Sequence, residues 1–91
     1  MEAVATEAAV PVDATVTVRY WAGARAAAGV DLDRIAADTV GEAVAAVADL
    51  RPGLRGVLEV STLLLDGSPA RSADPVPPGA TIEVLPPFAG G

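Results

Sequence analysis

The amino-acid sequence contains no cysteine, no histidine and no lysine in its 91 residues. These absences exclude thiolate and imidazole metal ligands, disulfides, nucleophiles activated by histidine, and Schiff-base chemistry on lysine. Carboxylate pairs are still available, but the acidic residues are scattered, and none lies in a cluster that would raise its pKa for acid–base catalysis. We therefore expect no metal site and no catalytic side chain.

Aromatic residues and positive charges are also scarce. The only aromatic residues are Tyr20, Trp21 and Phe88, so the core must be aliphatic. Twelve acidic residues against six arginines give a net charge of -6, which disfavours nucleic acid and anionic membranes and suits basic partners. No apolar stretch is long enough to span a membrane, and Glu2 and Glu7 lie where a secretory signal would be positive. We expect a cytoplasmic protein that binds neither nucleic acid nor membranes.

The length of the chain allows one domain with a modest core. Residues 1–14 sustain neither a helical nor a strand period, so we expect a flexible N-terminal arm there. The folded domain is expected over residues 15–85, followed by a flexible C-terminal Gly-Gly tail over residues 86–91.

The first part of the domain predicts two strands joined by a short helix. Residues 15–21 alternate apolar and polar side chains, which predicts a half-buried strand with Trp21 on its outer face. Residues 22–28 are alanine-rich and are followed by a glycine, which predicts a short helical turn; a second strand is expected over residues 30–35. The apolar positions of these two strands are Val16, Val18 and Tyr20 in the first, and Val30, Leu32 and Ile35 in the second.

Residues 40–50 show the best helical pattern. Thr39 is a good N-cap, and Glu42 follows three residues later, as in a capping box. Pro52 and Gly53 would end the helix. Its apolar positions recur at helical spacing and are Val40, Ala43, Val44, Val47 and Leu50.

The second part of the domain predicts a hairpin and a final strand. Residues 54–60 fit either a helical turn or an irregular link. Residues 61–65 predict a strand, and the pair Asp66-Gly67 is typical of a hairpin turn, after which residues 69–71 would return. A proline-rich loop then leads to the last strand, residues 80–85. That strand would place Ile82 and Val84 on one face and Glu83 and Leu85 on the other.

This order of elements predicts the fold class. It is typical of an α+β protein with a ubiquitin-like β-grasp fold, in which a mixed sheet of four to five strands packs on one main helix. The last strand would end close to the C-terminus.

The C-terminal segment PPFAGG is the strongest candidate site. Two consecutive prolines restrict the backbone to extended conformations and remove two donors, so this tail should project away from the sheet. Two final glycines have no Cβ, so the terminus could enter a narrow tunnel in another protein. The expected tail-threading residues are Pro86, Pro87, Phe88, Ala89 and Gly90.

The carboxylate of Gly91 is the group that we expect to react. It is ionised near neutral pH and, once positioned by a partner, could attack the α-phosphate of ATP to form an acyl-adenylate. Sulfur could then replace the adenylate to give a thiocarboxylate, which passes the sulfur to an acceptor. The alternative is that the two glycines are only a frayed end.

Four residues outside the tail are candidates for partner binding, namely Trp21, Arg25, Leu63 and Leu85. An exposed tryptophan beside Leu85 and Phe88 would form an apolar docking patch. Alternatively, Trp21 covers the core from the end of its strand. Arg25 could pair with an acid on an activating enzyme, or it could be solvated, as single arginines on turns usually are.

Two segments resemble the MoaD/ThiS family of sulfur carriers, and its MoaD branch more closely. The segment VRYWAGARAAAG, residues 18–29, is similar to the family's first strand and arginine-bearing turn, and GATIEVLPPFAGG, residues 79–91, is similar to its last strand and tail. The resemblance covers about residues 15–91. Phe88 departs from the small aliphatic residue that is usual at its position, and the leader before Thr15 is uncommon.

The resemblance implies that an adenylyltransferase of the ubiquitin-activating type adenylates Gly91 with MgATP and that a persulfide donor then supplies sulfur. The chain itself would bind no cofactor and would be a non-catalytic carrier. In the MoaD branch the carrier is the small subunit of molybdopterin synthase, whose large subunit receives the tail and uses its sulfur for the molybdenum cofactor. The large subunit is therefore the first expected partner.

Other functions are compatible with the same residues. Relatives serve thiazole, cysteine and specialised-metabolite synthesis, so the partner could be another sulfur-accepting enzyme. A ubiquitin-like modifier would instead join Gly91 to target lysines through an isopeptide bond. A β-grasp interaction module with a chemically idle tail is a third possibility, because the fold alone does not decide among them.

Overall fold

The computed structural model describes residues 15–87. These residues form one five-stranded sheet with the strand order β2-β1-β5-β3-β4. The strands are β1 (Val16–Tyr20), β2 (Leu32–Ile35), β3 (Thr62–Leu65), β4 (Ser68–Pro69) and β5 (Thr81–Leu85). The expected N-terminal arm, residues 1–14, and the last four residues, 88–91, lie outside the described residues.

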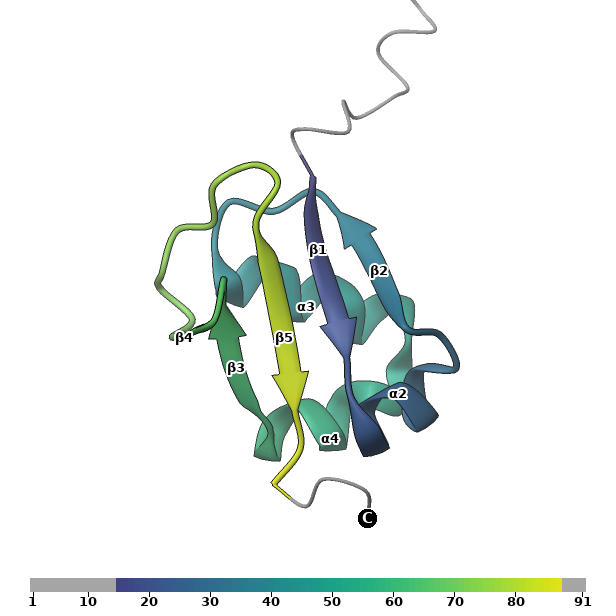
Figure 1. The fold of residues 1–91 in the computed structure, drawn as a ribbon. Helices are drawn as coiled ribbons and strands as arrows, with labels where there is room; N and C mark the ends of the chain where they lie inside the picture. The colour runs from purple at the N-terminus through teal and green to yellow at the C-terminus, as the bar shows by residue number, and fades with distance from the viewer. Residues whose placement is uncertain (1–14, 88–91) are drawn as a thin grey trace, which may run out of the picture.

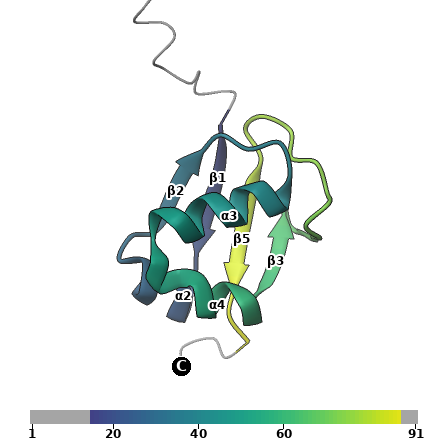
Figure 2. The same ribbon diagram turned by 180° about the vertical axis from the view of Figure 1, so that it is seen from behind.

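The helices lie on one side of the sheet, as the two opposite views in Figures 1 and 2 show. The longest, α3 (Val40–Leu50), crosses behind the strands in Figure 1 and in front of them in Figure 2. The shorter helices lie near the end of the sheet at which β1 and β5 finish, and they are α2 (Ala22–Ala28), η2 (Pro52–Leu54) and α4 (Arg55–Val60). The expected architecture, a mixed sheet packed on one main helix, is confirmed.

The centre of the sheet is the parallel pair of β1 and β5, in which Val18 lies opposite Ile82 and Tyr20 opposite Val84. β1 also pairs antiparallel with β2, and β5 pairs antiparallel with β3. Buried and partly exposed residues alternate along both central strands, as predicted, because successive side chains point to opposite faces. The most deeply buried residues are Val16, Val18, Tyr20, Ala24, Val40, Ala43, Val47, Leu54, Ile82 and Val84.

The predicted helix over residues 40–50 forms with those bounds. The Thr39 side chain caps it by accepting a hydrogen bond from the Glu42 backbone N–H at 3.1 Å. The Glu42 carboxylate reaches back and accepts from the Asp38 backbone N–H at 2.8 Å, one residue before the expected partner in a capping box. This pair of contacts fixes where α3 begins.

Two apolar side chains that we expected in the core lie outside it. Leu50 is 57% exposed because α3 ends at this residue, and Leu54 of η2 fills the core instead. Leu32 pairs with Arg19, whose side chain points away from the helices. The strand starts at Leu32 rather than at residue 30. Asp33 lies opposite the buried Val18 and therefore faces inward.

Two local segments are also settled by the structure. The ambiguous residues 54–60 are helical, with Leu54 and Leu58 buried. The predicted hairpin turn is confirmed, because Asp66 and Gly67 have φ values of 48° and 88°, which are those of a type I′ turn. The returning strand, β4, begins at Ser68, one residue earlier than predicted.

The loop between β4 and β5 closes the N-terminal end of α3. The Val40 and Gly41 backbone N–H groups donate to the carbonyl oxygens of Asp74 and Ser72, both at 2.9 Å. These bonds satisfy donors that have no partner inside a helix. The approach is close, since a Cβ added at Gly41 would lie 3.1 Å from the Ser72 oxygen.

Replacing Gly41 by alanine should therefore gain less stability than a glycine-to-alanine change usually gives in a helix. A matched control is Gly56 in α4, where an added Cβ meets nothing within 4 Å. We expect Gly56→Ala to stabilise the protein by up to about 1 kcal/mol and Gly41→Ala to be neutral or destabilising, as measured by urea unfolding. Equal stabilisation by both changes would show that the Ser72 loop moves freely.

Candidate functional site

The tail leaves the folded domain from the middle of the sheet. β5 ends at Leu85, and Pro86 and Pro87 follow, the first half-buried and the second exposed. Neither proline has a backbone N–H, so the pairing of β5 with its neighbours stops there. We call residues 85–87 the tail root; it lies at the end of the sheet near α2 and α4 (Figures 1 and 2).

The tail root accounts for only part of the predicted site. Leu85 lies on the outer side of β5, as expected from the alternation along that strand. The predictions for Phe88, Ala89, Gly90 and Gly91 fall outside the described residues, so their roles stay predictions.

Trp21 lies directly beside the tail root. Its backbone N–H donates to the Val84 carbonyl at 3.3 Å, and its side chain is 39% exposed. The expectation that Trp21 lies opposite the inward side chains of β1 is confirmed, and the alternative that it covers the core is wrong.

The Trp21 ring is held by two side chains from the central strands. The indole Nε1 donates to the Glu83 carboxylate at 3.2 Å, and the Arg19 guanidinium carbon lies 5.5 Å from the ring centroid, within the range of a cation–π contact. Arg19 and Glu83 are themselves opposite each other in the register of β1 and β5. The ring is therefore partly immobilised by contacts within the chain.

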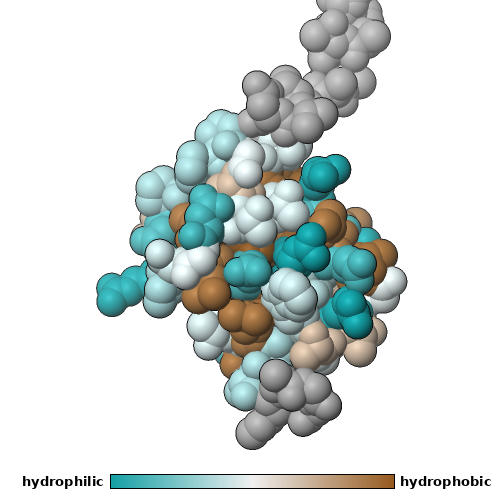
Figure 3. All heavy atoms as spheres, viewed as in Figure 1, coloured by the Kyte–Doolittle hydropathy of each residue, from teal (hydrophilic) through white to brown (hydrophobic). Residues whose placement is uncertain are grey.

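The helix-free face of the sheet, which we call the open face, surrounds this ring. Its register places Leu32 beside Arg19, and Leu64 beside Glu83. Apolar and polar side chains alternate across it (Figure 3). The open face consists of Thr17, Arg19, Trp21, Leu32, Arg34, Thr62, Leu64, Thr81, Glu83 and Leu85.

Leu63 is not on the open face. It lies opposite Val84, a core residue, and packs against the core. Its neighbour Leu64 faces outward instead. The run Thr62–Leu65 has leucine on both faces of β3, so its sequence carries no alternation from which the outward leucine could be chosen.

Arg25 lies on α2, one turn beyond Trp21. Its guanidinium forms a 3.5 Å ion pair with Asp31 of the same chain, and the two side chains are 60% and 69% exposed. An exposed pair at this distance contributes little to stability. Arg25 is thus accessible, and the predicted contact with an acid on a partner stays a prediction.

The backbone between Trp21 and α2 takes an unusual conformation. Ala22 has φ of 49°, in the left-handed region that residues with a Cβ rarely adopt. This turn lets the Trp21 carbonyl accept hydrogen bonds from Ala24 and Arg25, at 2.9 and 3.3 Å. The predicted glycine stop is confirmed, because Gly29 follows α2 with φ of 79°.

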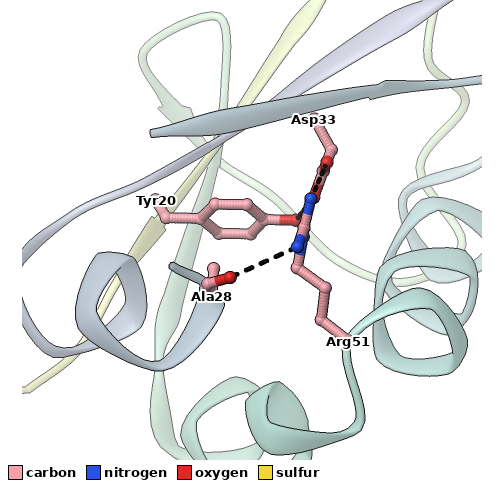
Figure 4. A network of polar contacts seen from close by, with 4 residues as sticks. All are labelled: Tyr20, Ala28, Asp33 and Arg51. Carbon is pink, nitrogen blue, oxygen red and sulfur yellow. Dashed lines mark hydrogen bonds and ion pairs between the residues drawn. The ribbon is translucent and has the colours of Figure 1, made fainter. Parts of the chain in front are cut away.

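A polar network lies beneath the same end of the sheet (Figure 4). Arg51, just after α3, donates to both carboxylate oxygens of Asp33 on β2, at 2.6 and 2.7 Å. The Tyr20 hydroxyl donates to Asp33 at 2.6 Å, and Arg51 also donates to the Ala28 carbonyl at 3.3 Å. The network therefore joins β1, β2, α2 and the end of α3.

The network changes the pKa of its members. The Arg51 hydrogen bonds hold the pKa of Asp33 below its ordinary value, although burial opposes them. Burial, helped by the neighbouring Asp33 carboxylate, raises the pKa of the Tyr20 hydroxyl above its ordinary range. Tyr20 therefore stays protonated as a donor, and Asp33 stays ionised as an acceptor. The two groups are held by each other and by Arg51, so we interpret the network as structural.

No metal site or membrane span was found in the part of the chain that the structure describes. Residues 15–87 hold no group of three or more acidic residues placed to bind a metal ion together. They also contain no helix that is long and apolar enough to cross a bilayer.

The chain is similar to known proteins in structure. No family model and no curated protein matches the sequence. Solved structures do match. A chain of the complex of subunits 1 and 2 of molybdopterin-converting factor from Helicobacter pylori is 26% identical, with a TM-score of 0.66; the match covers 85% of this chain and 99% of that one.

Two further matches have higher structural similarity and lower identity. SAMP1 from Haloferax volcanii has a TM-score of 0.76 at 24% identity, covering 85% of this chain and 99% of that one. The putative molybdopterin converting factor subunit 1 from Pyrococcus furiosus has a TM-score of 0.74 at 19% identity, covering 81% and 98%. This chain is a ubiquitin-like β-grasp protein. Its resemblance to the MoaD branch is thus supported by the structures that it matches.

The β-grasp fold explains why the site residues cluster. In this β-grasp protein β1 and β5 run parallel. Trp21 at the end of β1 and the tail root at the end of β5 therefore meet at the same end of the sheet. Sequence reasoning missed Arg19, Glu83 and Leu64. The pairing of β1 with β5 and β3 would have revealed them, because they occupy outward positions of adjacent strands.

The strain at Ala22 gives a first prediction for this site. Ala22→Gly should stabilise the protein by about 1 kcal/mol, because glycine adopts the left-handed conformation without a Cβ penalty. The control Ala26→Gly, at an exposed position within α2, should destabilise it by a similar amount. Thermal unfolding followed by circular dichroism measures both. If both changes destabilise, Ala22 is not strained.

The Asp33 network gives a second prediction. A carboxyl whose pKa is depressed in the folded state contributes stability above its unfolded pKa, near 3.9, and that contribution is lost as pH falls through the folded value. Asp33→Asn should therefore cost about 2 kcal/mol at pH 7 and flatten the loss of stability below about pH 4. Urea unfolding at pH 7 and at pH 3 measures both effects.

Asp49 supplies the control for that experiment. It forms a 3.1 Å ion pair with Arg55, and the side chains of Asp49 and Arg55 are 80% and 60% exposed. Asp49→Asn should leave both stability and its pH dependence nearly unchanged. An equal response of the two variants would mean that the Asp33 network contributes no more than a surface pair.

Proposed function

We propose that this chain is a sulfur-carrier protein whose terminal carboxylate, on Gly91, is converted to a thiocarboxylate. The observation that carries the proposal is the tail root, where the central strand β5 ends in two prolines beside the exposed Trp21. The match to a chain of the molybdopterin-converting factor from Helicobacter pylori supports it. The chain would be a non-catalytic carrier that meets its partners in the cytoplasm.

The chemistry requires partners, because the chain has no thiol, imidazole or amine side chain. The Gly91 carboxylate would attack the α-phosphate of MgATP bound by an adenylyltransferase of the ubiquitin-activating type, and pyrophosphate would leave. A persulfide sulfur would then displace AMP from the acyl carbon, and a thiol would cleave the resulting acyl disulfide to release the thiocarboxylate. The carrier supplies the position of the carbon, and the partners supply the reactivity.

The open face suits this role because the tail leaves from the end of this face that holds Trp21 and Leu85. A partner that covers Trp21 and Leu85 would hold the domain while the tail enters its active site. We propose the large subunit of molybdopterin synthase as the sulfur acceptor. Another sulfur-accepting enzyme would use the same geometry and is the alternative within this function.

A second candidate function is that of a ubiquitin-like protein modifier. The favouring observation is the structural match to SAMP1, whose solved structures include one described as small archaeal modifier protein 1. The same activated Gly91 would then be attacked by a lysine of a target protein, with formation of an isopeptide bond. The two functions share adenylation and differ in the nucleophile.

Intact-mass measurement tests the proposed function. The protein ending at Gly91 is incubated with the adenylyltransferase from its own organism, MgATP and a persulfide donor. We expect the mass increase of one oxygen exchanged for one sulfur. If the protein stays unmodified under saturating conditions, the carrier proposal is wrong. If the chain appears only in isopeptide conjugates, the modifier function is favoured.

Deletion of Gly91 is the matched control. The deletion should abolish sulfur loading, because the glycine carboxylate would then be displaced by one residue from the activating site. The deletion should leave the midpoint of thermal unfolding nearly unchanged, since Gly91 comes six positions after Leu85, the last residue of β5, in the sequence. A large loss of stability would contradict the proposed role of the tail.

A further inference from the structure

The charges of the chain are distributed unevenly between the open face and the rest of the domain. The open face carries two arginines, Arg19 and Arg34, and one acidic residue, Glu83. The other described residues carry eight acidic side chains and four arginines. A protein with a net charge of -6 therefore presents a face with a net positive charge.

The two arginines on this face differ in their surroundings. Arg19 lies over the Trp21 ring and beside Glu83, so its charge is partly balanced. Arg34 is exposed at the edge strand β2, opposite Thr17, and has no ion-pair partner among the described residues. Arg34 is thus the open-face charge that is free to meet a partner.

Apolar side chains share this face with the arginines. Leu32 is the first residue of β2, two positions before Arg34, and Leu64 and Leu85 flank Glu83 from the neighbouring positions. None of the three leucines is fully buried within the chain. Such a mixture of partly exposed apolar groups with an arginine at the rim is typical of a protein interface.

We propose that the open face docks onto a protein surface that is apolar opposite Trp21 and Leu85 and acidic opposite Arg34. This inference rests on the proposed function, since it describes the surface by which the activating adenylyltransferase holds the carrier. It replaces the expectation, drawn from net charge alone, that partners are basic. Only the local charge faces the partner at contact distance, because charges further away are screened by salt.

The negative charge of the remaining surface also favours one orientation of the chain in the complex. An acidic partner surface repels the helix-covered side of the domain and attracts the open face, which steers the encounter toward one orientation. A nucleic acid or an anionic membrane would experience the same attraction. Two arginines on an otherwise acidic protein give too little positive charge for either, so a protein is the occupant.

Adenylation kinetics with charge variants test the proposal. Arg34→Glu should raise the KM for the carrier about tenfold and leave kcat unchanged, because the tail still reaches the active site once bound. Arg34→Gln should raise the KM less, in the same direction. The control Arg71→Glu makes the same charge change in the exposed loop after β4 and should alter the KM less than about twofold.

Salt dependence supplies an independent readout. The KM of the unchanged protein should rise between about 0.05 M and 0.3 M salt, and that rise should be lost in Arg34→Glu. Circular dichroism confirms that each variant is folded. The proposal is overturned if the KM of Arg34→Glu is unchanged or lower, or if Arg71→Glu raises the KM equally. It is also overturned if the unchanged protein binds phosphatidylserine vesicles and Arg34→Glu does not, because a membrane would then be the occupant.

The experiment separates this inference from the function on which it rests. If the unchanged protein is not adenylated at all, the carrier function fails, and the proposed partner surface fails with it. If the unchanged protein is adenylated and Arg34→Glu reacts with the same KM, the carrier function stands and only the charge complementarity of the open face is wrong.

Discussion

The parallel pairing of β1 with β5 is the contact on which the rest of this structure depends. It brings together two segments that are more than sixty positions apart in the sequence, with Tyr20 opposite Val84. Because both strands run in the same direction, both finish at the same end of the sheet. Trp21, the residue after β1, is exposed and bonds to the carbonyl of Val84, two residues before the first proline of the tail. A tail that left from an edge strand, or from the opposite end of β5, would have no such ring beside it.

The outer elements of the domain are tied to this central pair by polar contacts rather than by burial alone. On one side, Arg51 and Asp33 join the edge strand β2 to the end of α3, and the Tyr20 hydroxyl connects both to β1. On the other, the loop before β5 closes the start of α3 through the Ser72 and Asp74 carbonyls. The core is small and aliphatic apart from Tyr20, so contacts of this kind restrict the orientation of elements that could otherwise slide over one another.

The sequence was informative wherever a single element determines the pattern. Alternation identified the inward residues of β1 and β5, and the capping residues placed the start of α3. The sequence was uninformative where the orientation or partner of a side chain depends on the neighbouring element. Leu63 and Leu64 are chemically identical, and only the register against Val84 decides which one faces outward. The role of Arg51 could not be predicted either, because its partner Asp33 is eighteen positions away on an edge strand whose start was predicted two residues too early.

The electrostatic consequences of the fold follow from the same register. Net charge is a property of composition, and it describes how the protein behaves at distances beyond the screening length. Contact is governed by whichever charges a strand places on the exposed side of the sheet. In β1 and β2 the outward positions hold Arg19 and Arg34, whereas the acidic Asp33 of β2 is turned inward to Arg51. One carboxylate is thereby removed from the open face, and Arg34 remains on it, at the end of the sheet opposite the tail root. The fold thus gives an acidic chain an open face that is locally basic, and this local sign, rather than the total charge, is what a protein docked on that face would have to match.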